Sequence, residues 1–388
     1  MVKKKKLRNL LCGTLLLLHG YSFAQTGKPN IILILVDDMG YSDIGSYGSE
    51  IHTPNLDKLA YEGIRLKEFY NNAICAPTRA SLLTGLYPHK AGLGYFDVNL
   101  GLPAYQGYLN KESLTLGEVL KTAGYKTLLS GKWHVGKDSS VWPNQRGFDR
   151  FYGITAGAAN YFDADPLPLG DEPYPVTLIE NNQRLHPKPN SYYFTDEITN
   201  HAIKYLDEAT TTNNPFFLYV AFNAPHWQLQ ALPEDIQKYK GRYDIGWDSL
   251  RQERLAKQVA LGIRDPKQTP AERDPKVPAW NSLTYDEQQL WKAKMEVYAA
   301  MVDRVDQGVG KLLDALKRLK KDDNTIIFFI SDNGAPAEDV AHIGKKAGRN
   351  TGPVGTSGSF ESQGKNWSHV SNSPFKAFKA FAYEGGIS

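Results

Sequence analysis

Four short, mostly apolar runs, each followed at once by polar residues, mark the chain of 388 residues. They cover residues 31–36, 125–129, 216–222 and 326–330. Hydrophobicity within each run is continuous rather than alternating, which is typical of strands covered on both faces. The pattern therefore predicts four strands of a parallel sheet.

Helical patterns lie between these runs. Residues 53–60 begin with Thr and Pro, residues 114–123 end at Gly124, and residues 296–319 carry a longer apolar repeat at helical spacing. Strands that alternate with helices predict an α/β fold with a doubly wound, mostly parallel sheet. Such sheets bind ligands beyond the carboxyl ends of their strands, where all four polar segments fall.

Two segments, 156–190 and 229–281, are less regular, and we expect both to leave the sheet and shape a rim. The second contains Tyr239, Tyr243 and Trp247. These rings either stack on a sugar or aryl group of a substrate or pack the insertion itself, and the sequence favours neither alternative.

The N-terminus has the pattern of a secretory signal. Residues 2–9 are rich in Lys and Arg, residues 10–18 are apolar, and residues 22–24 offer a cleavage site. We therefore expect a signal peptide over 1–24 and a mature chain over 25–388, exported to the periplasm or the extracellular space. The apolar stretch is too short to span a membrane, and no later run approaches that length.

Charge and cysteine content narrow the class of protein. Five of the 45 Lys and Arg residues lie in the leader, which leaves 40 against 42 Asp and Glu. A basic nucleic-acid-binding protein is therefore excluded, and 41% hydrophobic residues argue against disorder. Cleavage also removes Cys12, so Cys75 is the single cysteine of the mature chain. An unpaired thiol is unusual in an oxidising compartment, and its presence has to be explained.

Carboxylates follow the first and last apolar runs. Asp37 and Asp38 end one, and Asp332 and Asn333 end the other. Three carboxylates that meet at one sheet edge would repel each other without a cation between them. Hard oxygen ligands of this kind favour Ca²⁺, with Mg²⁺ as second choice. Alternatively, these are ordinary turn residues.

The segment from Cys75 to Gly85 predicts a helix with Pro77 near its start and Gly85 at its end. Cys75 would stand at the helix N-terminus, where free N–H groups attract an anion. Arg79 adds a permanently charged donor in the first or second turn. Five residues thus combine a nucleophile position, an anion cradle and a guanidinium.

Residues 75–79 match the C-x-P-x-R signature of type I sulfatases, and this chain resembles that family, in particular its bacterial arylsulfatase-like members. Further blocks match in family order at residues 37–41, 131–134, 223–226 and 331–334 and from Lys379 to 386. The resemblance runs from about Pro29 to the last residue and implies an alkaline-phosphatase-like fold.

The resemblance implies that a separate maturation enzyme converts Cys75 into formylglycine. One oxygen of the hydrated aldehyde then attacks sulfur and expels the alcohol or phenol, leaving a sulfated enzyme. Loss of the proton from the second hydroxyl releases inorganic sulfate and restores the aldehyde.

The same resemblance assigns roles to the other residues. A Ca²⁺ shell is implied for Asp37, Asp38, Asp332, Asn333 and the modified Cys75. Arg79 would stabilise charge during transfer, and Lys132 and Lys379 would hold sulfate oxygens. His134 would be the base that triggers sulfate release, and His226 would protonate the leaving oxygen.

The implied function is hydrolysis of an aryl or carbohydrate sulfate ester, with a slight preference for carbohydrate. The partners are this ester and the maturation enzyme, with no nucleic acid and no membrane span. Two alternatives stay open: a formylglycine-dependent phosphonate or phosphate ester hydrolase, and an inactive protein that binds sulfated glycans.

The chain stops at residues 385–388, whereas family members continue into a further strand and a smaller C-terminal domain. We therefore expect that domain to be missing, one sheet edge to be exposed, and solubility to suffer.

Overall fold

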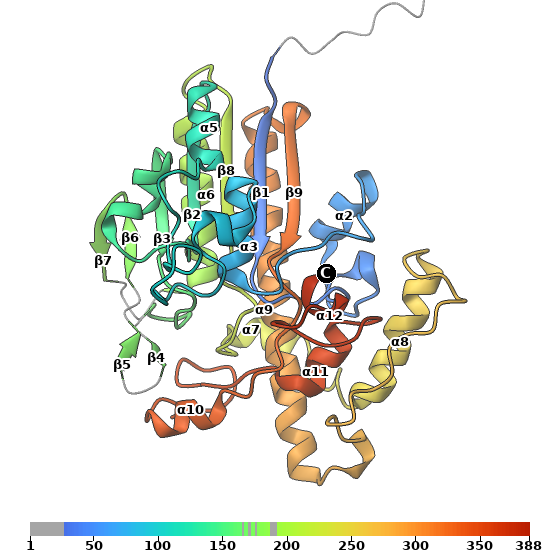
Figure 1. Ribbon diagram of the computed structural model, residues 1–388. Coiled ribbons are helices and arrows are strands. Elements are labelled where there is room, and N and C mark those ends of the chain that lie inside the picture. The colour runs from blue at the N-terminus through green and yellow to red at the C-terminus, as the bar shows by residue number, and fades with distance from the viewer. Residues whose placement is uncertain (1–26, 165–166, 170–171, 175–176, 187–191) are drawn as a thin grey trace, which may run out of the picture.

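The computed structural model describes residues 27–164, 167–169, 172–174, 177–186 and 192–388, so the predicted signal peptide lies outside the described residues. A seven-stranded sheet in the order β7-β6-β3-β2-β8-β1-β9 forms the centre of the molecule, and helices cover it (Figure 1). Within the described ranges, no helix is both long enough and apolar enough to cross a membrane.

The strands of this sheet are β1 (Asn30–Val36), β2 (Lys126–Gly131), β3 (Arg150–Ile154), β6 (Leu178–Glu180), β7 (Gln183–Leu185), β8 (Phe216–Ala221) and β9 (Thr325–Ser331). A separate hairpin joins β4 (Leu167–Leu169) to β5 (Glu172–Tyr174). The neighbours from β3 to β9 pair in parallel, and β6 and β7 add antiparallel pairs at one edge. The predicted α/β fold is confirmed, and all four predicted strands are present within two residues of their expected bounds.

The helices are α2 (Pro54–Glu62), α3 (Cys75–Thr84), α4 (Pro88–Ala91), α5 (Leu116–Thr122), α6 (Phe194–Ala209), α7 (Pro233–Gln237), α8 (Gly246–Ala260), α9 (Tyr285–Arg318), α10 (Ala341–Lys346), α11 (Gly364–Ser371) and α12 (Glu384–Ile387). Helix α9 begins well before the predicted residue 296. The reason is a capping box, in which Thr284 and Glu287 satisfy each other's free backbone N–H groups.

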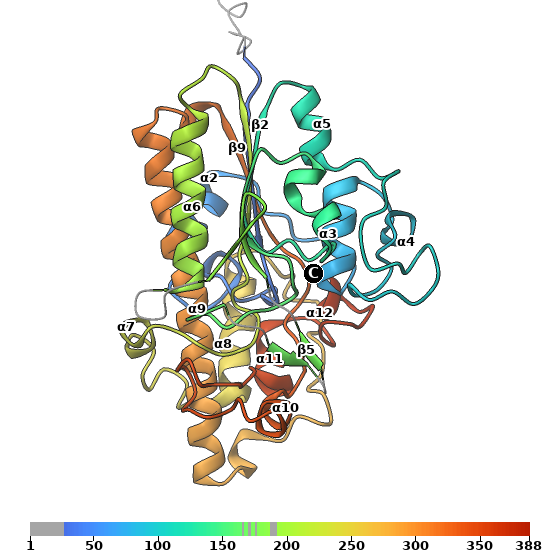
Figure 2. The same cartoon turned by 90° about the vertical axis from the view of Figure 1, so that its left-hand side faces the viewer.

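Helices α6 and α9 lie on one face of the sheet, and α3 and α5 lie on the other (Figure 2). Strand β1 supplies side chains alternately to both layers. Ile32, Ile34 and Val36 join the core beneath α9, whereas Leu33 and Leu35 join the core beneath α3. Burial on both faces explains why the sequence of this strand is continuously apolar.

The interpretation of segment 229–281 as a substrate rim is wrong for its aromatic residues. Tyr239, Tyr243 and Trp247 are 5%, 0% and 1% exposed. The Trp247 ring packs edge-on against Trp280 and Trp367, with centroids 4.7 and 5.6 Å apart. These rings pack the insertion, as the second alternative held, and none is free to stack on a substrate.

Segment 156–190 also departs from expectation, because β6 and β7 extend the sheet instead of leaving it. Parts of this segment lie outside the described residues. At the opposite edge, β9 leaves the side chains of Ile326 and Phe328 about half exposed, while Ile327 and Phe329 pack against the core. One face of β9 is therefore partly exposed, and β9 is not covered on both sides.

Candidate active site

The predicted metal ligands meet where two neighbouring strands end. Strands β1 and β9 pair in parallel with Val36 opposite Ser331, so Asp37 and Asp332 follow them side by side. The backbone N–H of Asp332 donates to the Val36 carbonyl at 3.1 Å, and that of Asp38 donates to Asp332 Oδ1 at 3.3 Å. The strand register thus brings together residues almost 300 positions apart in the sequence.

Asn333 completes this group. Its Nδ2 donates to Asp38 Oδ1 at 2.6 Å, and all four side chains are fully buried. Asp38 has a φ of +67°, a left-handed conformation that Asp tolerates better than most residues. The backbone reversal there turns the chain sharply directly after β1.

Three cationic side chains surround the three carboxylates. Lys132 pairs with Asp37, and Lys379 Nζ lies 2.8 Å from Asp38 Oδ1. Arg79 donates to Asp332 Oδ2 through Nε at 3.0 Å and Nη2 at 2.7 Å. Burial alone would raise the pKa of Asp37 and Asp38, but the two lysines hold both below the usual range.

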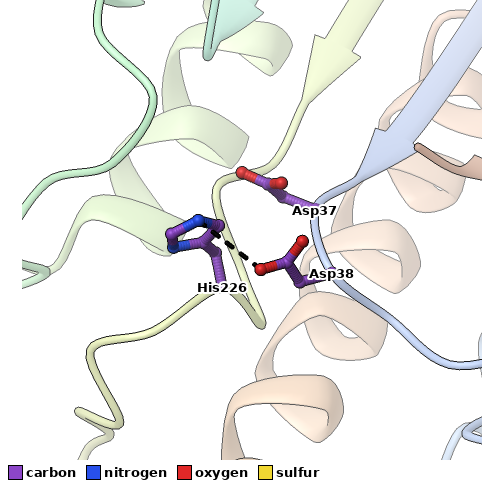
Figure 3. Close-up of side chains that lie close together, drawn as sticks. All are labelled: Asp37, Asp38 and His226. Atoms are coloured by element: carbon purple, nitrogen blue, oxygen red, sulfur yellow. Dashed lines mark ion pairs between the residues drawn. The ribbon is translucent and has the colours of Figure 1, made fainter. Parts of the chain in front are cut away.

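The group fits a hard cation. Asp37 Oδ1 and Asn333 Oδ1 are buried, and neither finds a hydrogen-bond partner within the described part of the chain. A buried oxygen without a partner is costly, and a cation that it coordinates removes that cost. Asp37, Asp38 and His226 also offer ligand atoms within 4.8 Å of one another (Figure 3).

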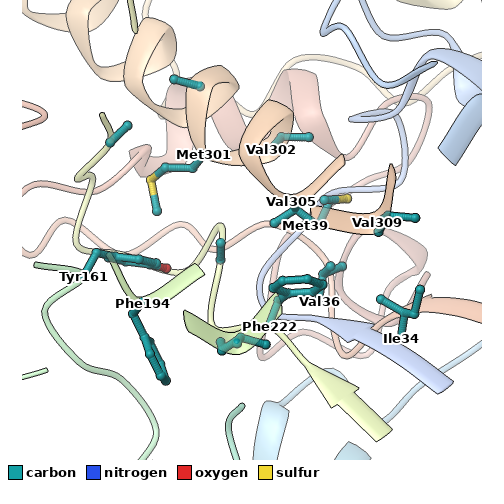
Figure 4. Packing of buried hydrophobic residues seen from close by; sticks show 14 of the residues in the cluster. Ile34, Val36, Met39, Tyr161, Phe194, Phe222, Met301, Val302, Val305 and Val309 are labelled. Carbon is teal, nitrogen blue, oxygen red and sulfur yellow. The ribbon is translucent and has the colours of Figure 1, made fainter. Parts of the chain in front are cut away.

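A packed apolar layer supports the carboxylates from below. Val36 and Met39, on either side of Asp37 and Asp38, belong to the core that α9 covers with Val302 and Val305 (Figure 4). Interiors of this kind are close-packed, so the loop between Val36 and Met39 has little freedom to move. The ligand oxygens are therefore held in place before any cation arrives.

Cys75 is the first residue of α3, as predicted, and its side chain is buried. Gly85 ends the helix with a φ of +69°, and its N–H donates to the Ser81 carbonyl at 2.8 Å. Burial, opposed by Lys132 and Lys379, raises the pKa of the thiol to about 11. An unmodified Cys75 would thus stay protonated at neutral pH and be a poor nucleophile.

His226 follows β8, and its ring is oriented by the backbone. Nδ1 faces the carbonyl oxygen of Trp227, which only accepts, so Nδ1 carries a proton. Nε2 then faces Asp38 Oδ2 at 3.5 Å (Figure 3). The sequence predicted proton transfer for His226. The geometry adds a second role that the sequence missed, since Nε2 is also placed to ligate a cation together with Asp38.

His134 follows β2 and is buried, with Nε2 3.5 Å from Asp97 Oδ1. Burial, together with Lys132, lowers the pKa of this histidine, so the ring is neutral at neutral pH. The sequence missed Asp97, because no strand, helix cap or motif precedes it. Only the folded loop between α4 and α5 brings it to the site.

The structure thus brings the predicted residues together at one end of the sheet, and none is displaced to another face. Arg79, Lys132 and Lys379 each pair with one of the carboxylates, and Arg79 Nη1 donates to the Lys132 carbonyl at 3.0 Å. The arrangement is a buried cluster of opposite charges at a helix N-terminus, which suits an anionic group with a cation beside it.

Comparison with known proteins agrees with this geometry. The family model described as "Sulfatase" matches residues 29–386. The chain is 36% identical over 385 residues to the arylsulfatase of Klebsiella aerogenes, covering 96% of this chain and 82% of that protein. It is 37% identical to an uncharacterised sulfatase of Schizosaccharomyces pombe, covering 94% of this chain and 69% of the relative.

Solved structures share the fold. The structure of Ps i-CgsB in complex with k-i-k-neocarrahexaose has a TM-score of 0.62 and 30% identity, and the match covers 93% of this chain. This chain spans 64% of the length of that protein. The family match covers most of the chain, and the relatives share more than a third of its residues. The chain therefore belongs to the sulfatase family.

Proposed function

We propose that this protein hydrolyses sulfate esters and releases inorganic sulfate, with formylglycine at position 75 and Ca²⁺ at the carboxylates. One observation carries the proposal. Three buried carboxylates and three buried cations surround the N-terminus of α3, where Cys75 is the first residue. Such a buried cluster of opposite charges suits the binding of an anion beside a cation.

The chain's own cations bind the sulfate group. Lys132, Lys379 and Arg79 are at most 5% exposed, so their attraction for an anion is weakly screened. The free N–H groups at the start of α3 add donors on the same side. Donors fixed in this way stabilise the charge that develops on the equatorial oxygens during transfer.

Two groups complete the chemistry. Ca²⁺, held by Asp37, Asp38, Asp332 and Asn333, would act as a Lewis acid that polarises an ester oxygen. Formylglycine, made from Cys75 by a maturation enzyme, would supply a geminal diol with one hydroxyl for attack and a second for release. The raised pKa of the thiol agrees with a need for such conversion.

The two histidines handle protons. His134 is buried and neutral, which suits a base that removes a proton from a hydroxyl at position 75. His226 carries its proton on Nδ1 and turns Nε2 toward the carboxylates. When Nε2 binds a proton in place of a cation, His226 would be the donor to the leaving oxygen.

For the substrate, we infer a sulfated carbohydrate. The support is the 30% identity to Ps i-CgsB, which was solved in complex with a neocarrahexaose. The aromatic rings of segment 229–281 are buried, so sugar recognition depends on other residues of the rim.

The test is release of inorganic sulfate from sulfated oligosaccharides and an aryl sulfate by protein co-expressed with a formylglycine-generating enzyme. We expect turnover by the wild type, none by Cys75→Ala, and a loss of about 10²–10³-fold in kcat for Lys132→Met. Lys58→Met is the matched control, because the Lys58 side chain is half exposed and its ion-pair partner in the described part of the chain is Glu62 at the surface.

The outcomes separate the alternatives. Faster turnover of a matched aryl phosphonate than of the sulfate would replace the proposal with a phosphonate hydrolase. Binding of sulfated glycan without turnover by fully converted protein would replace it with a binding protein. Full activity of Cys75→Ala would exclude every mechanism in which residue 75 is the nucleophile.

A further inference from the structure

Asp97 is a buried carboxylate that the proposed chemistry has not yet used. Its side chain is 4% exposed and lies between two basic groups. Asp97 Oδ1 is 3.5 Å from His134 Nε2, and Asp97 Oδ2 is 3.1 Å from Lys137 Nζ. Asp97 comes from the loop between α4 and α5, whereas His134 and Lys137 follow β2, so the contact joins two separate segments.

The two nitrogens of His134 have different surroundings. Nε2 faces Asp97, but Nδ1 is buried and finds no hydrogen-bond partner within the described ranges. His134 and Lys137 outweigh burial and hold the pKa of Asp97 below its usual value, so Asp97 is an ionised acceptor. A carboxylate accepts only, and Nε2 must therefore carry the proton of the neutral ring. Nδ1 is then left with the free lone pair.

The ring has little room to turn over. A Cβ on Gly157 would lie 2.7 Å from both Cε1 and Nε2 of His134, so that glycine packs directly against the edge of the ring. His134 itself has a φ of +55°, an uncommon conformation that the surrounding structure must hold. The packing fixes the ring plane, and Asp97 selects which nitrogen carries hydrogen.

We propose that Asp97 is the positioning residue that makes His134 Nδ1 the base of the reaction. The proposal rests on the base role proposed for His134. Nδ1 takes the proton of the free hydroxyl of the sulfated residue 75, so that the O–H bond breaks, an N–H bond forms and the ring becomes positively charged. The electron pair left on that oxygen forms the C=O bond of the aldehyde while the C–O bond to sulfate breaks, and sulfate leaves with that bonding pair. Asp97, 3.5 Å from Nε2, stabilises that charge without accepting the proton.

Lys137 forms an ion pair with the same carboxylate. Asp97 already has one positive partner in Lys137, whose side chain is 31% exposed. This ion pair offsets part of the cost of burying the carboxylate. Lys137→Met should therefore leave the tautomer of His134 unchanged, since Asp97 still accepts from Nε2.

The tautomer can be read directly by ¹⁵N NMR of histidine-labelled protein, with His134→Gln to assign the resonances. The measurement uses unconverted protein with Cys75 intact and needs no turnover. In the wild type near pH 7, we expect a protonated Nε2 and an unprotonated Nδ1. In Asp97→Asn, whose amide also donates, we expect the Nδ1–H tautomer to gain population. Asp138→Asn is the control, because Asp138 is exposed and its side chain caps a short 3-10 helix by accepting from the Ser140 N–H.

The second readout is kcat and KM for sulfate ester hydrolysis, measured on protein in which Cys75 has been converted to formylglycine. Asp97→Asn should lower kcat about 10²-fold or more with little change in KM, because it removes assistance to proton transfer and leaves substrate binding intact. Asp138→Asn should match the wild type in both constants.

The outcomes distinguish this inference from the proposed function. An Nδ1–H tautomer in the wild type would overturn it, and this reading does not depend on whether any variant folds. A wild-type tautomer retained in folded Asp97→Asn would also overturn it and leave Asp97 as a loop anchor. If the tautomer behaves as expected but the wild type hydrolyses no sulfate ester, the positioning of His134 by Asp97 is supported and the proposed function is refuted.

Discussion

At the scale of single residues, the site is a set of buried charges that balance one another. Asp37, Asp38 and Asp332 are fully buried, and each has a lysine or arginine partner. Two buried oxygens, on Asp37 and Asn333, are still without a hydrogen-bond partner in the described part of the chain. We take those two oxygens as the residue-level evidence for a cation.

This predicts that Ca²⁺ stabilises the folded protein. Adding Ca²⁺ to chelator-treated protein should raise Tm, by an amount equivalent to about 2.7 kcal/mol at a concentration 100-fold above Kd. Asp37→Asn should lose most of that response, because it removes one charged ligand. Thermal unfolding with and without Ca²⁺ measures the effect, and Asp323→Asn, at an exposed carboxylate, is the control.

An equal rise in Tm for wild type and Asp37→Asn would show that Ca²⁺ binds elsewhere. A larger response to Mg²⁺ than to Ca²⁺ at the same concentration would change the identity of the ion but keep the site.

The sequence was informative for residues that directly follow a strand. Asp37 and Asp332 could be predicted as neighbours because parallel strands end at the same edge of the sheet. Asp97 could not, because it lies in a loop whose path depends on packing rather than on any local pattern. The second role of His226 was also hidden, since it depends on which ring nitrogen faces Asp38.

At the scale of elements, helix α8 anchors the loop that carries the carboxylates. Arg254 of α8 is fully buried and pairs with Asp43 Oδ1 at 2.6 Å and Glu50 Oε2 at 2.8 Å. Asp43 in turn accepts from the N–H of Gly40 at 2.9 Å and from the hydroxyl of Tyr298 at 2.6 Å. The insertion that contains α8 therefore stabilises the loop that follows Asp37 and Asp38.

This network predicts a large loss of stability for Arg254→Met. The variant leaves two buried carboxylates without their cation, which costs about 3–5 kcal/mol of unfolding free energy. Arg242→Met, which breaks an exposed pair with Glu253 of the same helix, should cost less than about 1 kcal/mol. Urea denaturation compares them, and similar losses for both variants would refute the anchoring role of α8.

The strands could be predicted because their apolar runs are continuous, and the long helices because their apolar residues recur at helical spacing. The role of α8 could not, because its segment mixes charged and aromatic residues with no clear period. Trp247 and Arg254 are both buried there, one in a cluster of tryptophans and one in an ion-pair network. A segment that lines a substrate site and a segment that packs in the interior can have similar compositions, and only the folded structure distinguishes them.

At the scale of the whole molecule, stability should fall as the pH falls below about 6.5. Burial, together with Arg251, lowers the pKa of His369 in α11 to about 4. Between these values the unfolded chain binds a proton at His369 that the folded chain does not, so acid favours unfolding. From about pH 7 to pH 5, this group should cost about 1–2 kcal/mol.

His369→Gln should remove that part of the pH dependence. Its unfolding free energy should fall less than that of the wild type between pH 7 and pH 5, although His134 and His226 retain their own contributions. Parallel pH profiles for the variant and the wild type would show that His369 is protonated as easily in the folded chain as in the unfolded one.

The state of residue 75 tests the account most directly. Trypsin releases the peptide from Glu68 to Arg79, and its mass distinguishes a thiol from an aldehyde at that position. We predict that protein active on a sulfate ester contains this peptide with formylglycine in place of Cys75. A peptide that still carries the intact thiol throughout a fully active preparation would contradict the account.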